Sequence, residues 1–588
     1  MAKFICKGDK FLLDGKPFTV YSGSIHYFRI PSFYWKDRLL KLKECGFNTV
    51  ETYDAWNIHE KTEGIFDFSG EADLGEFIDL AAELGLKVIV RGGPYICAEW
   101  EGGGLPAWLL SYPDMQLRTC NELYLSKVER YLENLFAVVK PRLISNGGNV
   151  IMMQVENEYG TFGNDKKYLE KIRSIYDKNG MDCQLFTCDG VEKNFLAVSK
   201  LDGIPAFANF GSDTVNNMQA LKALAPNQPL MCTEFWCGWF DHWHHHHHVR
   251  SAESICKDTE PFIQNGWGFN FYMFCGGTNF GFMNGANYPN TTYQYLPTVT
   301  SYDYNALLTE AGDRTAAYYG VRALFEKYGY KLPELSATET EKRAYGKVQF
   351  TACAELFNNL SAFGKSVYNA TPLSMEKLGQ AYGYVLYSTT VGEEVDGYEL
   401  NIDGLADRAN IFLNGKSLGV YERGQEYEKV KMSVKEPSKL DILIENMGRI
   451  NYGQYTLDSK GMTSARGVLE WRNCKLFHWD MYSLPMDDFS KVSFKEIPEK
   501  LSQTPTFYKG KFDVDKRADT FLKVDGFQKG FVLVNGVNIG RYYTSAGPQK
   551  TLFVPACYLQ EGENELLIFD SDGTARLDAE FLATPELG

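Results

Sequence analysis

Two stretches of the sequence carry carboxyl side chains at the end of apolar runs. The first, Val150–Gly160, reads VIMMQVENEYG and contains Glu156 and Glu158. The second, Pro229–Trp236, reads PLMCTEFW and contains Glu234. Two carboxyl groups at one site can hydrolyse a glycosidic bond, since one attacks or activates water while the other protonates the leaving oxygen. The alternative for each glutamate is a structural role, capping a helix or pairing with arginine.

Such a pair works only if its members differ in protonation. The nucleophile must be ionised, and the acid must keep its proton beside that negative charge, which like-charge repulsion favours. A retaining site places the carboxyl groups about 5 to 5.5 Å apart and an inverting site about 6.5 to 9.5 Å apart, and the sequence leaves both open. Side chains alternate along a strand, so Glu156 and Glu158 share a face unless the strand has already ended.

The elements that must position these residues form a repeating pattern in the first half of the chain. Short apolar runs alternate with amphipathic stretches, which is typical of a parallel (β/α)8 TIM barrel. The expected strands are Phe18–Ser24, Thr49–Tyr53, Val88–Arg91, Val150–Val155, Leu185–Cys188, Ala206–Phe210, Leu230–Thr233 and Phe269–Phe274. A helix start is expected within Glu71–Ile78. Polar and aromatic residues follow the runs, where a barrel builds its active site.

From about Ser336 onward, short alternating segments with Gly, Asn and Asp turns indicate all-β structure. The segments 413–419 and 534–540 resemble each other, and each contains an Asn-Gly pair that predicts a hairpin turn. We expect two jelly-roll-like sandwich domains after the barrel. The predicted boundaries are 1–330 for the barrel, 331–395 for a linker and first strands, and 396–500 and 501–588 for the sandwiches. Bracing of the barrel is the favoured role of the sandwiches, and sugar binding is the alternative.

Composition excludes several kinds of partner. The 588 residues carry a formal net charge of −15, which disfavours nucleic acid and anionic membranes. No apolar stretch approaches the roughly 20 residues of a spanning helix, and the amino terminus does not read as a signal peptide. The 13 cysteines have no recurring spacing and are expected to be reduced thiols. We therefore expect a cytoplasmic protein.

A run of five histidines, His244–His248, is the one unusual local feature. Adjacent imidazoles cannot all face one ion, so we interpret the run as a solvated loop. No metal site and no cofactor are predicted.

Several longer motifs are spread along the chain: SGSIHYFR at 22–29, TYDAWN at 52–57, PYICAEW at 94–100, GGLPAWL at 103–109, QVENEYG at 154–160, EFWCGW at 234–239, YMFCGGTNF at 272–280 and TSYDY at 300–304. With these motifs the sequence resembles glycoside hydrolase family 35, the β-galactosidases of a clan of retaining barrel hydrolases. The resemblance runs through the whole barrel and into the β-domains, as in bacterial members.

The resemblance implies roles for particular residues. Glu158 matches the family's acid/base, Glu234 its nucleophile, and Asn157 an amide that binds the sugar's 2-hydroxyl. Residues that match positions gripping or lining the sugar are Tyr53, Ile96, Cys97, Ala98, Glu99, Trp236, Trp239, Tyr272, Tyr302 and Tyr304. Glu156 is interpreted as support for the site rather than the acid. Glu99 is expected to bind substrate hydroxyls, and its alternative is to orient Glu158 or a backbone amide.

Two positions depart from the family pattern. Trp236 stands where animal relatives have Tyr, which leaves leaving-group specificity open, and Gly92 stands where Pro is usual. The resemblance implies a retaining exo-β-galactosidase acting on terminal β-D-galactose of oligosaccharides or glycans, with β-1,3 linkages favoured by similar bacterial members. Members of this family are often dimers, so the resemblance is compatible with a homodimer. The alternatives are a related retaining β-glycosidase of different glycone and a non-catalytic carbohydrate-binding protein.

Overall fold

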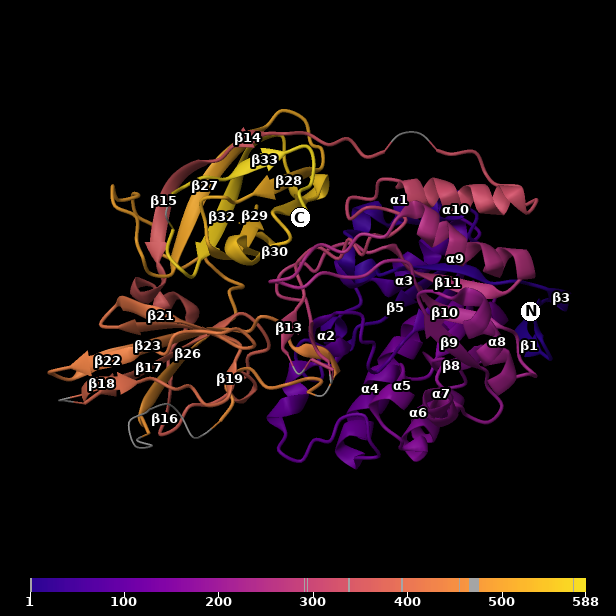
Figure 1. The fold of residues 1–588 in the computed structure, drawn as a ribbon, viewed down its shortest axis with the longest axis horizontal. Coiled ribbons are helices and arrows are strands. Elements are labelled where there is room, and N and C mark those ends of the chain that lie inside the picture. The colour runs from indigo at the N-terminus through magenta and orange to yellow at the C-terminus, as the bar shows by residue number, and fades with distance from the viewer. Residues whose placement is uncertain are drawn as a thin grey trace.

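The computed structural model describes residues 3–588 apart from 290, 293, 337, 338, 393, 394, 454, 465–474 and 575. An α/β barrel occupies one side of the molecule, and two all-β units stand one above the other on the opposite side (Figure 1). This arrangement confirms the expected fold class of a TIM barrel followed by all-β domains.

The barrel wall consists of parallel strands that close on themselves in the order β10-β11-β4-β5-β6-β7-β8-β9. All eight expected strands are confirmed, with ends shifted by a few residues. They are β4 (Tyr21–Ile25), β5 (Thr49–Tyr53), β6 (Lys87–Arg91), β7 (Val150–Gln154), β8 (Gln184–Gly190), β9 (Ala206–Phe210), β10 (Met231–Trp236) and β11 (Gly268–Cys275). Phe18 lies outside the wall because its N–H bonds to Phe11 of β2 (Lys10–Leu13).

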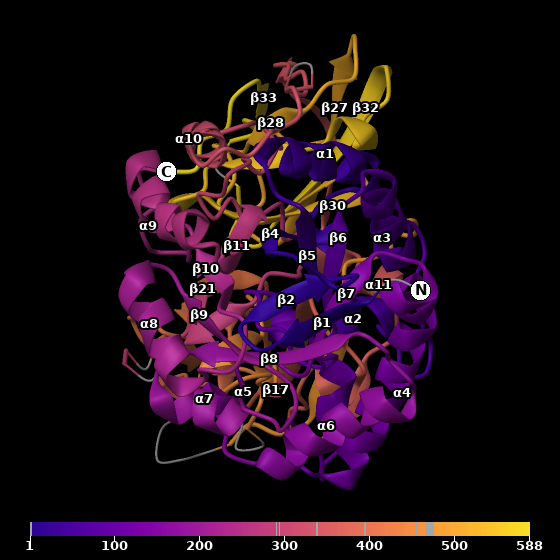
Figure 2. The ribbon, with the colours of Figure 1, turned by 90° about the vertical axis from the view of Figure 1, so that its right-hand side faces the viewer.

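Helices surround these strands (Figure 2). They are α1 (Trp35–Cys45), α2 (Trp56–His59), α3 (Leu74–Glu83), α4 (Glu122–Val139), α5 (Tyr159–Phe162), α6 (Lys166–Lys178), α7 (Lys193–Ser199), α8 (Thr214–Leu224), α9 (Ala252–Asn265) and α10 (Ala316–Lys327). The helix start expected within Glu71–Ile78 is confirmed, and α3 begins at Leu74. Gly70–Ala72 forms a 3-10 turn before it, and the Asp73 side chain caps α3 by accepting a hydrogen bond from the N–H of Glu76.

A small amino-terminal sheet covers one end of the barrel. It consists of β1 (Phe4–Lys7), β2 and β3 (Lys16–Pro17), and β1 and β2 lie across the barrel strands in Figure 2. Phe4 and Phe11 pack with Ile89, Ile151 and other residues from the barrel interior. Apolar packing therefore closes this end, and the open end is the one where the strands finish.

The two all-β units use sheets whose strands are far apart in the sequence. The first unit contains the sheet β16-β26-β17-β23-β20-β21, and the second combines β15-β27-β32-β29-β30 with β14-β33-β28-β31. The strands are β14 (Gly346–Lys347), β15 (Gln349–Glu355), β16 (Val367–Asn369), β17 (Tyr384–Val391), β20 (Arg408–Leu413), β21 (Lys416–Glu422), β23 (Ser438–Glu445), β26 (Trp479–Leu484), β27 (Thr506–Val514), β28 (Thr520–Lys523), β29 (Lys529–Val534), β30 (Val537–Tyr543), β31 (Thr551–Val554), β32 (Gly562–Asp570) and β33 (Glu580–Leu582).

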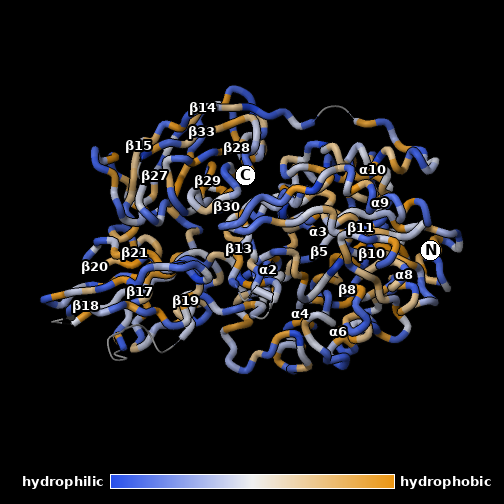
Figure 3. Tube along the Cα trace, in the orientation of Figure 1, coloured by the Kyte–Doolittle hydropathy of each residue, from blue (hydrophilic) through white to orange (hydrophobic). Residues whose placement is uncertain are grey.

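The repeated Asn-Gly pairs form the expected hairpin turns. Asn414 and Gly415 join β20 to β21, and Asn535 and Gly536 join β29 to β30. All four residues have positive φ, as such two-residue turns require. Hydrophobic residues concentrate in the strands of the barrel and of both units, whereas the loops are mostly hydrophilic (Figure 3). Among the described residues, no helix has the length and apolar character needed to cross a bilayer.

Candidate active site

Glu234 lies in β10 at the open end of the barrel and is 6% exposed. Its Oε1 accepts a hydrogen bond of 2.6 Å from the Tyr53 hydroxyl and lies 2.7 Å from Nη2 of Arg91. Its Oε2 accepts a bond of 3.1 Å from Nε1 of Trp236. The pairing of β10 with β9 shifts register between Cys232 and Glu234, an irregularity that re-aims side chains next to active sites. Three donors therefore face this carboxyl group and hold it in place.

Glu158 follows β7 and has a φ of 45°, in the left-handed region. Its Oε1 accepts a hydrogen bond of 2.9 Å from Nδ2 of Asn209. Burial, with the negative charges of Glu234 and Asp189, raises the pKa of Glu158 to about 8. Asn209 also lies opposite Glu234 where β9 pairs with β10. One residue therefore bonds to Glu158 through its side chain and lies beside Glu234 in the barrel wall. The raised pKa favours the protonated form of Glu158, which a general acid requires.

Glu156 points away from this pair. The strand ends at Gln154, and Glu156 has a φ of 60°, so strand alternation no longer places it beside Glu158. Arg118 binds its carboxylate through two nitrogens at 2.9 and 2.7 Å, and the Tyr168 hydroxyl donates a third bond of 2.9 Å. Arg118 also donates to the carbonyl of Asn157. The contacts of Glu156 with Arg118 and Tyr168 agree with the interpretation that it supports the site and is not the acid.

The Asn157 side chain is held by two donors. Its Oδ1 accepts bonds of 2.7 Å from Nη2 of Arg91 and 3.1 Å from Nε2 of Gln154. These donors fix the amide orientation, so that Nδ2 is the end left to donate to a sugar hydroxyl.

The segment Ile96–Glu99 bends sharply after β6. Cys97, Ala98 and Glu99 have φ values of 58°, 56° and 46°, three successive left-handed residues. The Tyr302 hydroxyl donates to Oε2 of Glu99. Burial, with the negative charge of Glu234 among the further causes, raises the pKa of Glu99 to about 7. Among the described residues Glu99 has no hydrogen bond to Glu158, so the structure does not support the alternative that it orients the acid.

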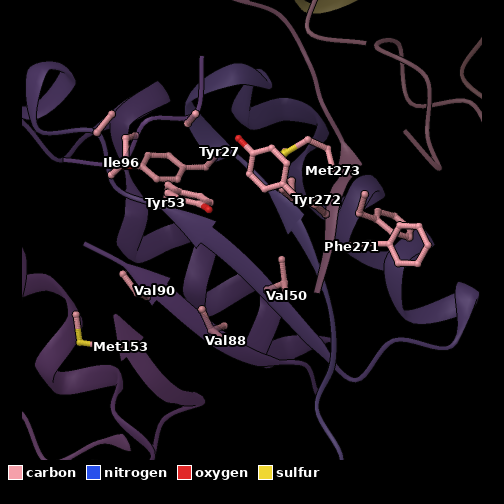
Figure 4. Close-up of a cluster of buried hydrophobic side chains, with 14 of the residues drawn as sticks. Tyr27, Val50, Tyr53, Val88, Val90, Ile96, Met153, Phe271, Tyr272 and Met273 are labelled. Atoms are coloured by element: carbon pink, nitrogen blue, oxygen red, sulfur yellow. The ribbon is translucent and has the colours of Figure 1, made fainter. Parts of the chain in front are cut away.

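Aromatic residues complete the pocket. The hydroxyls of Tyr272 and Tyr302 lie 3.0 Å apart, and the Tyr304 ring is 5.3 Å from each of their rings. Tyr53 and Tyr272 lie beside each other, beyond apolar barrel residues such as Val50 (Figure 4).

The outer part of the pocket carries two tryptophans. The rings of Trp236 and Trp239 meet edge to face at 5.9 Å. Trp239 is 40% exposed, so it lies at the mouth. The structure therefore brings all the predicted site residues to the open end of one barrel.

Comparison with known proteins decides the family. Residues 10–328 match the profile of glycosyl hydrolases family 35. The chain belongs to this family. Residues 372–485 match a profile described as the first all-beta domain of beta-galactosidase, and residues 505–564 match its galactose-binding domain.

Curated relatives of this family 35 chain match over most of its length. Beta-galactosidase of Bos taurus is 41% identical over 93% of this chain and 87% of its own. Beta-galactosidase-1-like protein 2 of Homo sapiens is 38% identical over 99% of this chain and 91% of its own. Among solved structures, GH5_18 from Streptomyces cattleya aligns with a TM-score of 0.40 at 16% identity, over 55% of this chain and 83% of that chain.

Sequence analysis missed several residues of the family 35 site. Arg91 was visible only as the last residue of an expected strand, yet it contacts Glu234 and Asn157. His26 is fully buried, and its ring lies 4.9 Å from that of Tyr53. Burial and nearby arginines lower the pKa of His26 well below its usual value, so the ring is neutral. Its Nε2 is buried and has no hydrogen-bond partner among the described residues.

Proposed function

We propose that this glycoside hydrolase is a retaining exo-β-galactosidase that removes terminal non-reducing β-D-galactose from oligosaccharides or glycans. The observation that carries the proposal is the different surroundings of its two carboxyl groups. Glu158 keeps a proton because its pKa is about 8 beside Glu234, while three donors face the Glu234 carboxylate. Relatives named beta-galactosidase at about 40% identity support galactose as the sugar.

The reaction proceeds by double displacement. An oxygen of Glu234 bonds to the anomeric carbon as the bond to the leaving oxygen breaks, and Glu158 gives its proton to that oxygen. Esterification removes the negative charge of Glu234, which lowers the affinity of Glu158 for a proton. Glu158 then takes a proton from water, whose oxygen displaces Glu234 from the same carbon. Two inversions return the β configuration.

Removal of single terminal sugars is consistent with the shape of the barrel. The amino-terminal sheet closes one end, and the buried tyrosines, with Glu99 and His26, surround the site with hydroxyl, carboxyl and imidazole groups. Trp236 and Trp239 at the mouth offer aromatic surfaces to the leaving group. A β-1,3 linkage is the preference we propose for that group.

Two measurements test this function. A panel of nitrophenyl glycosides should show preferential cleavage of the β-galactoside, and preferential cleavage of the β-glucoside would favour the related glycosidase. Proton NMR during early turnover should show β-galactose as the first product. Initial release of the α-anomer would instead indicate inversion.

A further inference from the structure

Asp189, near the end of β8, takes no direct part in the double displacement, yet its side chain is fully buried beside the turn that carries Glu158. β8 lies between β7, which leads to Glu158, and β9, which supplies Asn209. The preceding residue, Cys188, faces the barrel interior, where its Sγ accepts a bond of 3.0 Å from Nη2 of Arg91. Since side chains alternate along a strand, Asp189 faces the helices outside the wall. Any effect of Asp189 on the reaction must therefore pass through another residue.

The Asp189 carboxylate holds the turn that carries Glu158. Its Oδ2 accepts a hydrogen bond of 2.6 Å from the N–H of Gly160, two residues after Glu158. The same oxygen accepts a bond from the hydroxyl of Ser199 in α7, and Oδ1 accepts one of 3.2 Å from the N–H of Gly190. The turn is thereby fastened to β8 and α7.

Close packing leaves this turn little freedom. A Cβ at Gly160 would lie 2.7 Å from Oδ2 of Asp189 and closer still to a carbonyl oxygen of α7, so only glycine fits there. Tyr159, between Glu158 and Gly160, is 2% exposed, and its hydroxyl donates to the carbonyl of Arg118 at 2.9 Å. The backbone that follows Glu158 is therefore held by defined contacts, and Asp189 makes one of them.

Asp189 also holds a negative charge near Glu158. Burial raises the pKa of Asp189 to about 6, so its carboxyl group is ionised at neutral pH and above. After burial and the charge of Glu234, the charge of Asp189 is the next cause that raises the pKa of Glu158 to about 8. The Asn209 amide and the Arg91 guanidinium act in the opposite direction.

Other titratable groups near the two carboxyl groups keep one charge state in this pH range. Burial raises the pKa of the phenols and thiols that face Glu158, so they are neutral near pH 8; these groups are Tyr95, Cys97, Cys188 and Tyr452. Arg118 is the cation that faces Asp189, and it is paired with Glu156. The influence of Asp189 can therefore be measured through the titration of Glu158.

From these contacts we propose that Asp189 is a positioning residue for Glu158: its carboxylate fixes the turn that carries the acid and keeps a negative charge beside it. The inference rests on the proposed function, in which Glu158 gives its proton to the leaving oxygen. A nearby negative charge makes loss of that proton harder, which extends the pH range in which the acid can act.

The test is the pH profile of kcat/KM for phenyl β-galactoside, whose leaving oxygen needs a proton. Asp189→Asn keeps an oxygen that can accept from Gly160 and removes the charge, so its alkaline limb should move to lower pH by roughly one pH unit. Asp189→Ala also removes the hydrogen bonds and should lower kcat/KM at the optimum roughly ten- to hundredfold. Asp73→Asn makes the same change at the cap of α3 and should leave the limb in place.

Glu158→Gln, measured in the same assay, separates this proposal from the proposed function. It should lose most of its activity on this substrate together with the alkaline limb. If it does so while Asp189→Asn keeps the limb of the unmodified chain, Glu158 is the acid and the role of Asp189 is overturned. An alkaline limb that persists in Glu158→Gln would overturn both assignments.

If circular dichroism shows that Asp189→Asn does not fold, NMR of the unmodified chain decides. The carboxyl carbons of Glu158 and Asp189 are isotopically labelled and followed across the pH range. Besides its own titration near pH 8, the Glu158 signal should show a smaller step at the pH where the Asp189 signal titrates, near pH 6. A Glu158 signal without that step would overturn the proposal.

Discussion

The guanidinium of Arg91 lies 2.7 Å from the Glu234 carboxylate, inside a barrel where both side chains are almost fully buried. A hydrogen bond to a charged group contributes about 1.5–3 kcal/mol, so Arg91→Met should lower kcat/KM roughly ten- to hundredfold. Arg173→Met, on the surface of α6, is the control. An unchanged kcat/KM in Arg91→Met would contradict the assigned role of Arg91.

The raised pKa of Glu158 predicts an alkaline limb in the pH profile of kcat/KM. The general acid must be protonated in the free enzyme, so kcat/KM should fall as the pH rises past about 8. The hydrogen bond from Asn209 favours the charged form of Glu158 and lowers its pKa. Asn209→Ala should therefore move the alkaline limb to still higher pH. An alkaline limb that stays in place or moves to lower pH would show that Asn209 does not stabilise the charged form of Glu158.

Azide distinguishes the two carboxyl groups. Glu158→Ala should retain activity on substrates with good leaving groups, and azide should increase its turnover and give the β-galactosyl azide. Glu234→Ala should give the α-galactosyl azide, because azide then replaces the nucleophile directly. The anomers are identified by NMR. The reverse pattern would exchange the two assignments.

Local patterns were sufficient to predict the barrel and, within a few residues, the ends of its strands. β7 and β10 begin as apolar runs, so Glu158 and Glu234 could be placed near strand ends from the sequence alone. The divergence of Glu156 and Glu158 was not predictable in this way, because it depends on where β7 stops. The left-handed φ values at both residues then turn the two carboxyl groups toward different partners.

The pairing of strands that are distant in the sequence could not be predicted for a similar reason. β15 follows the barrel closely in the sequence but pairs with β27, where Cys353 lies opposite Tyr508. No local periodicity specifies a partner so distant along the chain. Arg91 and His26 were overlooked because an arginine at a strand end and a histidine in a motif have no distinctive pattern until burial and contacts are known.

The buried pair of Arg118 and Glu156 should contribute mainly to stability. Both side chains are at most 2% exposed, and removal of one partner leaves an uncompensated buried charge. Arg118→Ala should therefore destabilise the barrel by about 3–5 kcal/mol, measured as a lower denaturant midpoint. Lys36→Ala removes a surface pair with Glu83, in which both side chains are exposed, and should change stability by less than about 0.5 kcal/mol. Similar denaturant midpoints for both variants would show that the Glu156 carboxylate does not need Arg118 for its stabilisation.

The histidine run gives a final prediction about pH. His247 Nδ1 lies 2.6 Å from Asp241 Oδ2, and this hydrogen bond raises the pKa of His247. A raised pKa means that the stabilisation is complete below the ordinary histidine value of about 6.5 and is lost as the pH rises through the folded-state value. Hydrogen bonds from His247 and His248 outweigh burial and lower the pKa of Asp241, so the contribution of that carboxylate is present above its ordinary value and is lost in strong acid.

His247→Gln should consequently lower the melting temperature at pH 6, and the difference from the unmodified chain should shrink toward pH 9. His246→Gln, at an exposed neighbouring position, should show no such dependence. Thermal melts across this range test both variants. A destabilisation of His247→Gln that grows with pH would mean that the imidazole stabilises the loop in its neutral form, and the ion pair with Asp241 would then contribute nothing.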